Sequence, residues 1–149
     1  FAAERNAVAV YPIHPRARKQ LAAFDIAVPD EIRLLDPLGY LDFLALEDAA
    51  SLVFTDSGGV QEEACILGTP CVTVRDTTER PETVENGANV LAGVDPDDIV
   101  AAARRMVRAV PDWEMPFGDG TAGEQIVSIL VGAPSAVDRA DPRIQEVQK

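Results

Sequence analysis

Apolar residues along the chain follow two alternating patterns: short continuous runs of strand length, and longer segments in which they recur every three or four positions. The continuous runs predict strands at 7–13, 32–35, 51–55, 71–74 and 89–92, and the helical spacing predicts helices at 16–24, 40–50, 60–67, 96–109 and 121–131. Strands regularly separated by helices are typical of a parallel sheet with helices on both faces. The pattern therefore predicts an α/β fold over residues 1–131, followed by a segment of tail composition at 132–149.

Capping residues mark two of the predicted helix boundaries. Gly68 follows the last periodic residue of the helix at 60–67, where a C-terminal glycine belongs, and Pro70 comes just after it. Asp95 precedes Pro96 at the start of the helix at 96–109, a combination typical of an N-cap and the first helical position. We therefore expect both helices to begin or end at these positions.

The stretch at 51–63 has the strongest local signal, because an apolar strand stops at a polar turn and a helix begins at once. Unpaired N–H groups and the helix dipole make such a helix N-terminus favourable for a phosphate. Gly58 and Gly59 would let an anion approach the backbone, and the Ser57 hydroxyl would add a donor. The same pattern also fits a plain strand-to-helix connection, so the turn alone leaves both interpretations open.

The charge balance limits the kinds of partner. The chain has 25 acidic and 13 basic residues, a formal net charge of −12. Such a charge repels nucleic acid and anionic membranes. It also opposes a nucleotide ligand, so any phosphate site must be local, built from backbone donors and a few arginines.

Several features indicate a soluble, cytoplasmic protein. No apolar run reaches the roughly 20 residues of a membrane-spanning helix, and the first residues lack the pattern of a secretory signal. The only cysteines, Cys65 and Cys71, have neither the paired spacing nor the companion histidine of a metal site, so we expect reduced core residues and no metal. Because the chain starts at Phe1 without an initiator methionine, we also expect it to be cut from something longer.

Two consecutive motifs resemble a known family. TDSGGVQEEACILGTP at 55–70 and VTVRDTTERPETVENG at 72–87 look like the C-terminal domain of the non-hydrolysing UDP-N-acetylglucosamine 2-epimerases, with VYPIHP before them and PFGDG after them in the same order. The resemblance covers roughly residues 8–131, and its DTTERPE block is far more specific than a glycine turn. It implies one Rossmann-like half of a two-domain enzyme that binds UDP-N-acetylhexosamines between its domains.

The resemblance implies UDP-binding roles for particular residues. The diphosphate would lie on the turn, the ribose hydroxyls on a carboxylate in the following helix, the uracil in a pocket after the second strand, and an arginine would reach the ligand from the DTTERPE loop. The matching residues are Ser57, Gly58 and Gly59 for the diphosphate, Glu63 for the ribose, Asp36, Pro37 and Phe43 for the uracil, and Arg80 from the loop. For Arg80 a plain alternative is an ion pair with Glu79 or Glu82 that fixes the loop.

His14 is the only histidine, and a lone histidine at a strand end is more often structural than catalytic. In the family the matching histidine belongs to a second, regulatory UDP-GlcNAc site within a longer HLNPNV-like motif. This chain reads HPRARK there, so a regulatory role for His14 stays open.

The resemblance also implies what this chain lacks. The family interconverts UDP-GlcNAc and UDP-ManNAc by elimination and re-addition of UDP, without a cofactor, and its acid and base residues lie in the N-terminal domain. We therefore expect no catalytic residue here, no turnover from this chain alone, and a homodimer at full length. Two alternatives stay open: a nucleotide-binding half of a glycosyltransferase with the same architecture, and a non-functional gene fragment.

A missing strand is a further expectation. In the resembling domain a strand from an upstream HRRE segment lies between the strands that match 7–13 and 51–55. This chain does not contain it, although the end of the helix that follows it would match residues 1–5. We therefore expect either a gap between the two strands or a rearranged pairing that closes it.

Overall fold

A computed structural model describes residues 1–132 of the chain. Residues Phe1–Glu114 form one compact unit, and the chain from Met115 onward belongs to a second, described separately. Because the structure describes only Gly132 of the predicted tail at 132–149, that expectation lies outside the described residues.

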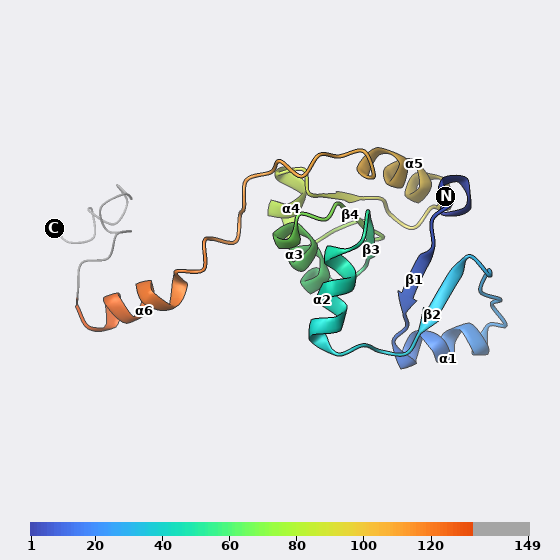
Figure 1. Cartoon of the computed structure of the whole chain (residues 1–149), viewed down its shortest axis with the longest axis horizontal. Coiled ribbons are helices and arrows are strands. Elements are labelled where there is room, and N and C mark those ends of the chain that lie inside the picture. Colours follow the sequence, from blue (N-terminus) through green and yellow to red (C-terminus); the bar gives the residue numbers. More distant parts are fainter. Residues whose placement is uncertain (133–149) are drawn as a thin grey trace. The chain divides into compact units, whose positions relative to one another are not determined.

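The first unit alternates strands and helices as the sequence predicts (Figure 1). In order it contains η1 (Ala3–Arg5), β1 (Ala9–Pro12), α1 (Pro15–Ala23), β2 (Ile32–Leu35), α2 (Tyr40–Asp48), β3 (Val53–Thr55), α3 (Gly58–Leu67), β4 (Cys71–Thr73), α4 (Pro81–Glu85), β5 (Asn89–Leu91) and α5 (Pro96–Met106). The second unit contains α6 (Ala122–Leu130). The short helix α4 was not predicted, because its five residues lie in a polar stretch too short to show helical periodicity.

The strands are all parallel, but in the described residues they form two separate sheets. One has the order β1-β2 and the other β3-β4-β5, and β1 does not pair with β3. The expected gap between these strands is therefore confirmed. Because β3 lies at an edge, its central residue Phe54 is 45% exposed and contacts Phe1 edge-to-face, with ring centroids 6.2 Å apart.

The core lies on both faces of β4, whose residues are all buried. Val72 points to one face, where it packs with Ala92 and Met106 under α5. Its neighbours Cys71 and Thr73 point to the opposite face because side chains alternate along a strand, and that face is covered by α3 (Figure 1). Helices on both faces of a parallel sheet confirm the predicted fold class.

The predicted caps are present on both helices. Asp95 accepts hydrogen bonds from the N–H groups of Asp97 and Asp98 at the start of α5, at 2.9 and 3.4 Å. Gly68 ends α3 with a φ of 78°, a left-handed conformation that glycine adopts at least cost.

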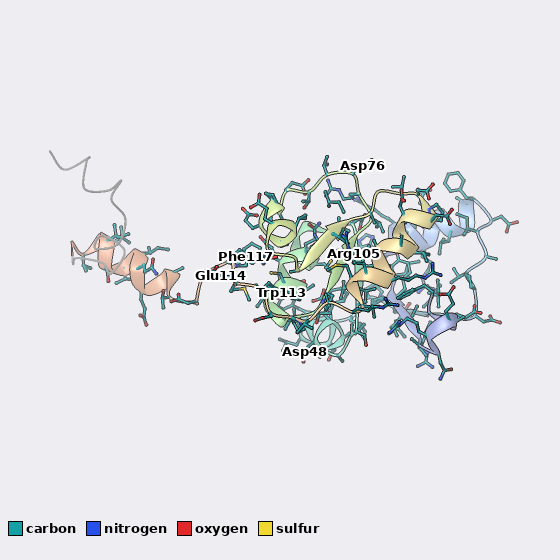
Figure 2. All side chains as sticks on the ribbon, turned by 90° about the horizontal axis from the view of Figure 1, so that it is seen from above. Asp48, Asp76, Arg105, Trp113, Glu114 and Phe117 are labelled. Carbon is teal, nitrogen blue, oxygen red and sulfur yellow. The ribbon has the colours of Figure 1, made fainter. Side chains whose placement is uncertain are left out.

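The segment after α5 returns to α3 before the first unit ends. The Trp113 indole N–H donates to the Cys65 carbonyl at 3.0 Å, and the Asn86 amide donates to the Glu114 carbonyl at 3.1 Å. Figure 2 shows Trp113 and Glu114 where this segment leaves the first unit. The first bond fixes the segment against α3, which carries the candidate site, and the second fixes it against the end of α4.

Candidate functional site

The N-terminus of α3 is open toward solvent at the carboxyl end of β3. Ser57 is the N-cap residue, but its hydroxyl caps no N–H group of the first turn. Instead, the Ser57 N–H donates to the Thr55 hydroxyl at 3.0 Å, which fixes the turn between strand and helix. The helix end thus keeps donors available to an anion, at the edge where open α/β sheets bind ligands.

Arg80 lies directly over this turn. A methyl group built at Gly58 would lie 3.8 Å from the Glu79 Oε2 and 3.9 Å from the Arg80 Cγ, which is ordinary van der Waals contact, so both side chains lie next to the turn. The Arg80 guanidinium forms an ion pair with Glu62 of α3 and donates from Nη1 to the Glu79 carbonyl at 3.0 Å. The alternative interpretation of Arg80 as half of an ion pair with Glu79 or Glu82 was wrong about the partner, which is Glu62.

Arg75 is a second cation beside the turn that the sequence reasoning did not single out. It donates to both carboxylate oxygens of Glu79 at 2.9 and 3.0 Å, and its Nη1 also reaches the Asp56 carbonyl at 3.4 Å. The hydrogen bond and the charge of Arg75 hold the pKa of Glu79 below its usual value. Two arginines therefore lie near the helix N-terminus in a chain of strongly negative net charge.

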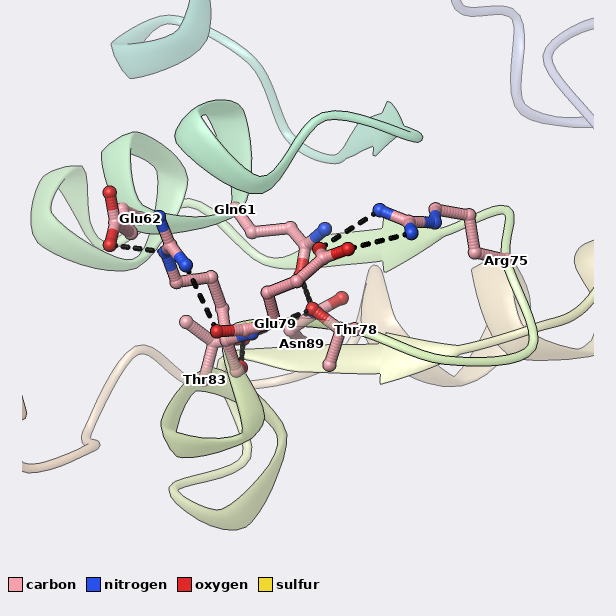
Figure 3. A network of polar contacts seen from close by, with 8 residues as sticks. Gln61, Glu62, Arg75, Thr78, Glu79, Thr83 and Asn89 are labelled. Carbon is pink, nitrogen blue, oxygen red and sulfur yellow. Dashed lines mark hydrogen bonds and ion pairs between the residues drawn. The ribbon is translucent and has the colours of Figure 1, made fainter.

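A buried polar network holds the loop that carries these arginines (Figure 3). Asn89 is its centre: its amide donates to the Gln61 Oε1 at 3.3 Å and to the Thr83 hydroxyl at 3.1 Å, and its Oδ1 accepts from the Thr73 hydroxyl at 2.9 Å. Gln61 Oε1 also accepts from the Thr78 hydroxyl at 2.5 Å. The network thus connects the sheet, α3 and the loop between β4 and α4.

Glu63 faces α2 rather than the arginines. Its charge, followed by burial, raises the pKa of the Tyr40 hydroxyl at the start of α2. Glu47, two turns further along α2, is 3% exposed, and neither carboxylate oxygen has a hydrogen-bond partner among the described residues. Burial and then the charge of Glu63 raise the pKa of Glu47 to about 7. Sequence reasoning did not single out Glu47, because only the packing of α2 on α3 buries it.

The raised pKa of Glu47 predicts a pH-dependent stability. The folded state holds this proton more tightly than the unfolded state, so the free energy of unfolding falls as pH rises from about 4.5 to about 7, and stays reduced above that. Glu47→Gln should remove this loss and stabilise the fold by about 1–3 kcal/mol at pH 8, with a smaller gain at pH 5. Urea unfolding at both pH values measures it, with the exposed neighbour Asp48→Asn as control. An equal effect of Glu47→Gln at both pH values would contradict the prediction.

The remaining predicted site residues lie elsewhere on the first unit. Asp36 forms an ion pair with Arg18 at 2.9 Å and, like Pro37, is exposed at the end of β2. Phe43 is half-buried on α2. His14 is the N-cap of α1, where its Nδ1 accepts from the Arg16 N–H at 3.2 Å. The structure thus brings Arg80 to the Gly58 turn, whereas no hydrogen bond or ion pair in the described residues joins Asp36, Pro37 or His14 to α3.

A hollow of about 440 Å³ lies at the start of β1 and β2, and its lining includes Asn6, Val8 and Arg33. These are the amino ends of the strands, where open α/β sheets do not place their ligands. We therefore assign the candidate site to the α3 N-terminus. Residues 1–132 contain no helix long and apolar enough to cross a membrane and no group of three or more side chains placed to hold a metal ion.

Comparison with known proteins identifies the class to which this fold and turn belong. The family model described as "UDP-N-acetylglucosamine 2-epimerase" matches residues 1–131. Curated proteins of that name from Methanococcus maripaludis and Methanocaldococcus jannaschii are 49% and 50% identical over 127 and 125 residues, which is 83% and 81% of this chain. A solved structure of the M. jannaschii protein, described as a complex with UDP-GlcNAc and UDP, superposes with a TM-score of 0.80 at 46% identity, covering 89% of this chain and 38% of that one.

The chain belongs to the UDP-N-acetylglucosamine 2-epimerase family. It spans only 35% and 34% of the length of the two curated relatives. Its fold matches their C-terminal, Rossmann-like half. The family assignment decides against the glycosyltransferase alternative.

Proposed function

We propose that this chain is the UDP-binding half of an enzyme that interconverts UDP-GlcNAc and UDP-ManNAc. The observation that carries the proposal is the uncapped N-terminus of α3, with Arg75 and Arg80 beside it, in a chain of this family. In this proposal the diphosphate lies on Ser57, Gly58 and Gly59, where helix N–H groups and the dipole favour negative charge.

The nucleoside would extend from the turn toward α2. Glu63 lies in the second turn of α3, where a carboxylate can accept hydrogen bonds from both ribose hydroxyls. Asp36, Pro37 and Phe43 are proposed for the uracil, and Arg80 for the ligand on the side of Gly58. The pair with Glu62 holds Arg80 at that position before any ligand arrives.

The reaction would be elimination of UDP from the sugar and re-addition at the opposite face of C2. It requires a base for a weakly acidic proton and an acid for the leaving group. We propose that an N-terminal half supplies both groups, since we assign no residue of this chain to either role, and that this chain alone has no turnover. The full-length polypeptide, meaning this chain joined to that half, is proposed to be a cytoplasmic homodimer, which light scattering would test.

We further propose that the upstream half supplies the strand that fills the gap between β1 and β3. β1 lies between β2 and β3 in space, yet pairs only with β2 in the described residues (Figure 1). Unpaired backbone groups on both sides of a gap can accept one more parallel strand. In this proposal residues 1–131 are one incomplete domain.

Glu63 tests the proposed site directly. In the full-length polypeptide, Glu63→Ala should weaken UDP binding by about 1–3 kcal/mol, because charge-assisted hydrogen bonds to the ribose are lost. Isothermal titration calorimetry measures the affinity, and Glu85→Ala, an exposed glutamate on α4, is the matched control. Unchanged affinity in Glu63→Ala would assign Glu63 to the scaffold and overturn its proposed role.

A further inference from the structure

Glu47 is a buried acid without a partner, on the helix that packs against the proposed ribose carboxylate. Its side chain is 3% exposed, and neither carboxylate oxygen receives a hydrogen bond within the described residues. Its backbone, in contrast, is engaged: the Glu47 carbonyl accepts from the Ala50 N–H at 3.1 Å and from the Thr69 hydroxyl at 3.0 Å. An isolated buried carboxylate costs free energy, so a carboxyl group in this position needs either a compensating interaction or a bound proton.

The geometry of α2 directs this acid toward Glu63. Tyr40 and Glu47 are seven residues apart, two helical turns, and therefore share one face of α2. The charge of Glu63 acts on the Tyr40 hydroxyl. The Thr69 hydroxyl, just beyond the end of α3, donates to the Glu47 carbonyl. Because helical side chains point toward their N-terminus, the Glu47 carboxyl extends back along α3 toward Glu63.

We propose that Glu47 is a positioning residue for Glu63, holding a proton so that Glu63 carries the single negative charge that receives the ribose of a nucleotide. This inference rests on the proposed function of Glu63 and adds a residue that the UDP site does not itself contact. A second ionised carboxylate beside Glu63 would repel both Glu63 and the diphosphate, so binding favours protonated Glu47. Ribose binding also removes water from Glu63, which strengthens this coupling.

Other titratable groups around Glu47 stay neutral near physiological pH. Besides Glu63 on α3, the titratable groups that interact electrostatically with Glu47 are Tyr40 of α2 and Cys71 of β4. Burial raises the pKa of the Cys71 thiol to about 12, and the charge of Glu63 raises the pKa of the Tyr40 hydroxyl above its usual value. Among these groups, a pH effect between about pH 6 and pH 8 therefore points to Glu47.

The test measures UDP-GlcNAc affinity by calorimetry in the full-length polypeptide across this range. UDP-GlcNAc is preferred to UDP because its phosphates are diesters, whereas a terminal phosphate titrates near pH 6. We expect the wild type to bind about three- to tenfold more weakly at the upper end, with net proton uptake shown by buffers of different ionisation enthalpy. Glu47→Gln should keep the low-pH affinity and lose the pH dependence, whereas Asp48→Asn should behave as wild type.

Three outcomes separate this inference from the proposed function. A wild-type pH profile unchanged in Glu47→Gln, with binding still weakened in Glu63→Ala, overturns the role of Glu47 alone. No binding by the wild type at any pH overturns both. If Glu47→Gln does not fold, Glu47→Met, which removes the polar group at similar length, gives the same readout: a flat profile supports the inference and a retained slope overturns it.

Discussion

The isolated chain is expected to be marginally stable or to associate through its strand edges, whereas the full-length polypeptide should unfold cooperatively as a soluble species. Among the described residues β1 and β3 each pair on one side only. Backbone groups along both facing edges would be unsatisfied wherever water is excluded, at about 1–3 kcal/mol each. Summed over a strand, this loss is comparable with the whole stability of a domain, about 5–15 kcal/mol.

Urea unfolding and light scattering of the two polypeptides would measure this difference. The matched control is a full-length variant in which the upstream segment proposed to fill the gap is replaced by a glycine-serine sequence of equal length, which keeps the length but cannot supply a strand. We expect that variant to lose most of the gain. A monomeric isolated chain as stable as the full-length polypeptide would contradict the proposed missing strand.

The exposed apolar side chains beside the gap support the same expectation. Val10 and Tyr11 of β1 and Phe54 of β3 are 37%, 44% and 45% exposed, although strands of a parallel sheet are normally covered on both faces. Only Phe54 has a described aromatic partner, Phe1. Unpaired strand edges with exposed apolar side chains are sites of association.

Local signals predicted most of the fold. Apolar periodicity predicted β2 at its observed residues, and capping chemistry placed Asp95 and Gly68 correctly, because each signal depends on neighbours in sequence. α4 was missed because its five residues contain no repeat. The split sheet was anticipated through the family resemblance, since apolar runs alone do not state which strands pair.

The candidate site was less predictable. Ser57, Gly58 and Gly59 were identified from a strand, turn and helix contiguous in sequence. Arg75 and the partner of Arg80 were missed, because Asp56 and Glu62 approach them only after β4 has returned alongside β3. In the sequence Glu47 looks like an ordinary helical glutamate, because only the packing of α2 on α3 in the folded structure buries it.

Replacement of Asn89 by leucine should destabilise the full-length polypeptide by about 2–4 kcal/mol and also weaken UDP binding. Asn89 is 3% exposed and makes three side-chain hydrogen bonds. Without it, the Thr73 hydroxyl loses its acceptor, and Gln61 and Thr83 each lose a donor, all in buried positions where unsatisfied groups are costly. Because Gln61 also holds Thr78, the loop that carries Arg80 should lose order.

A double replacement separates this network effect from a packing effect. Thr73→Val removes the hydroxyl that Asn89→Leu leaves without an acceptor, so Thr73→Val combined with Asn89→Leu should be less destabilised than the sum of the single variants. Urea unfolding gives the three free energies, and calorimetry gives UDP affinity for each variant. Strictly additive losses, or a loss below about 1 kcal/mol in Asn89→Leu, would show that the network does not act as a connected unit holding the Arg80 loop to the sheet.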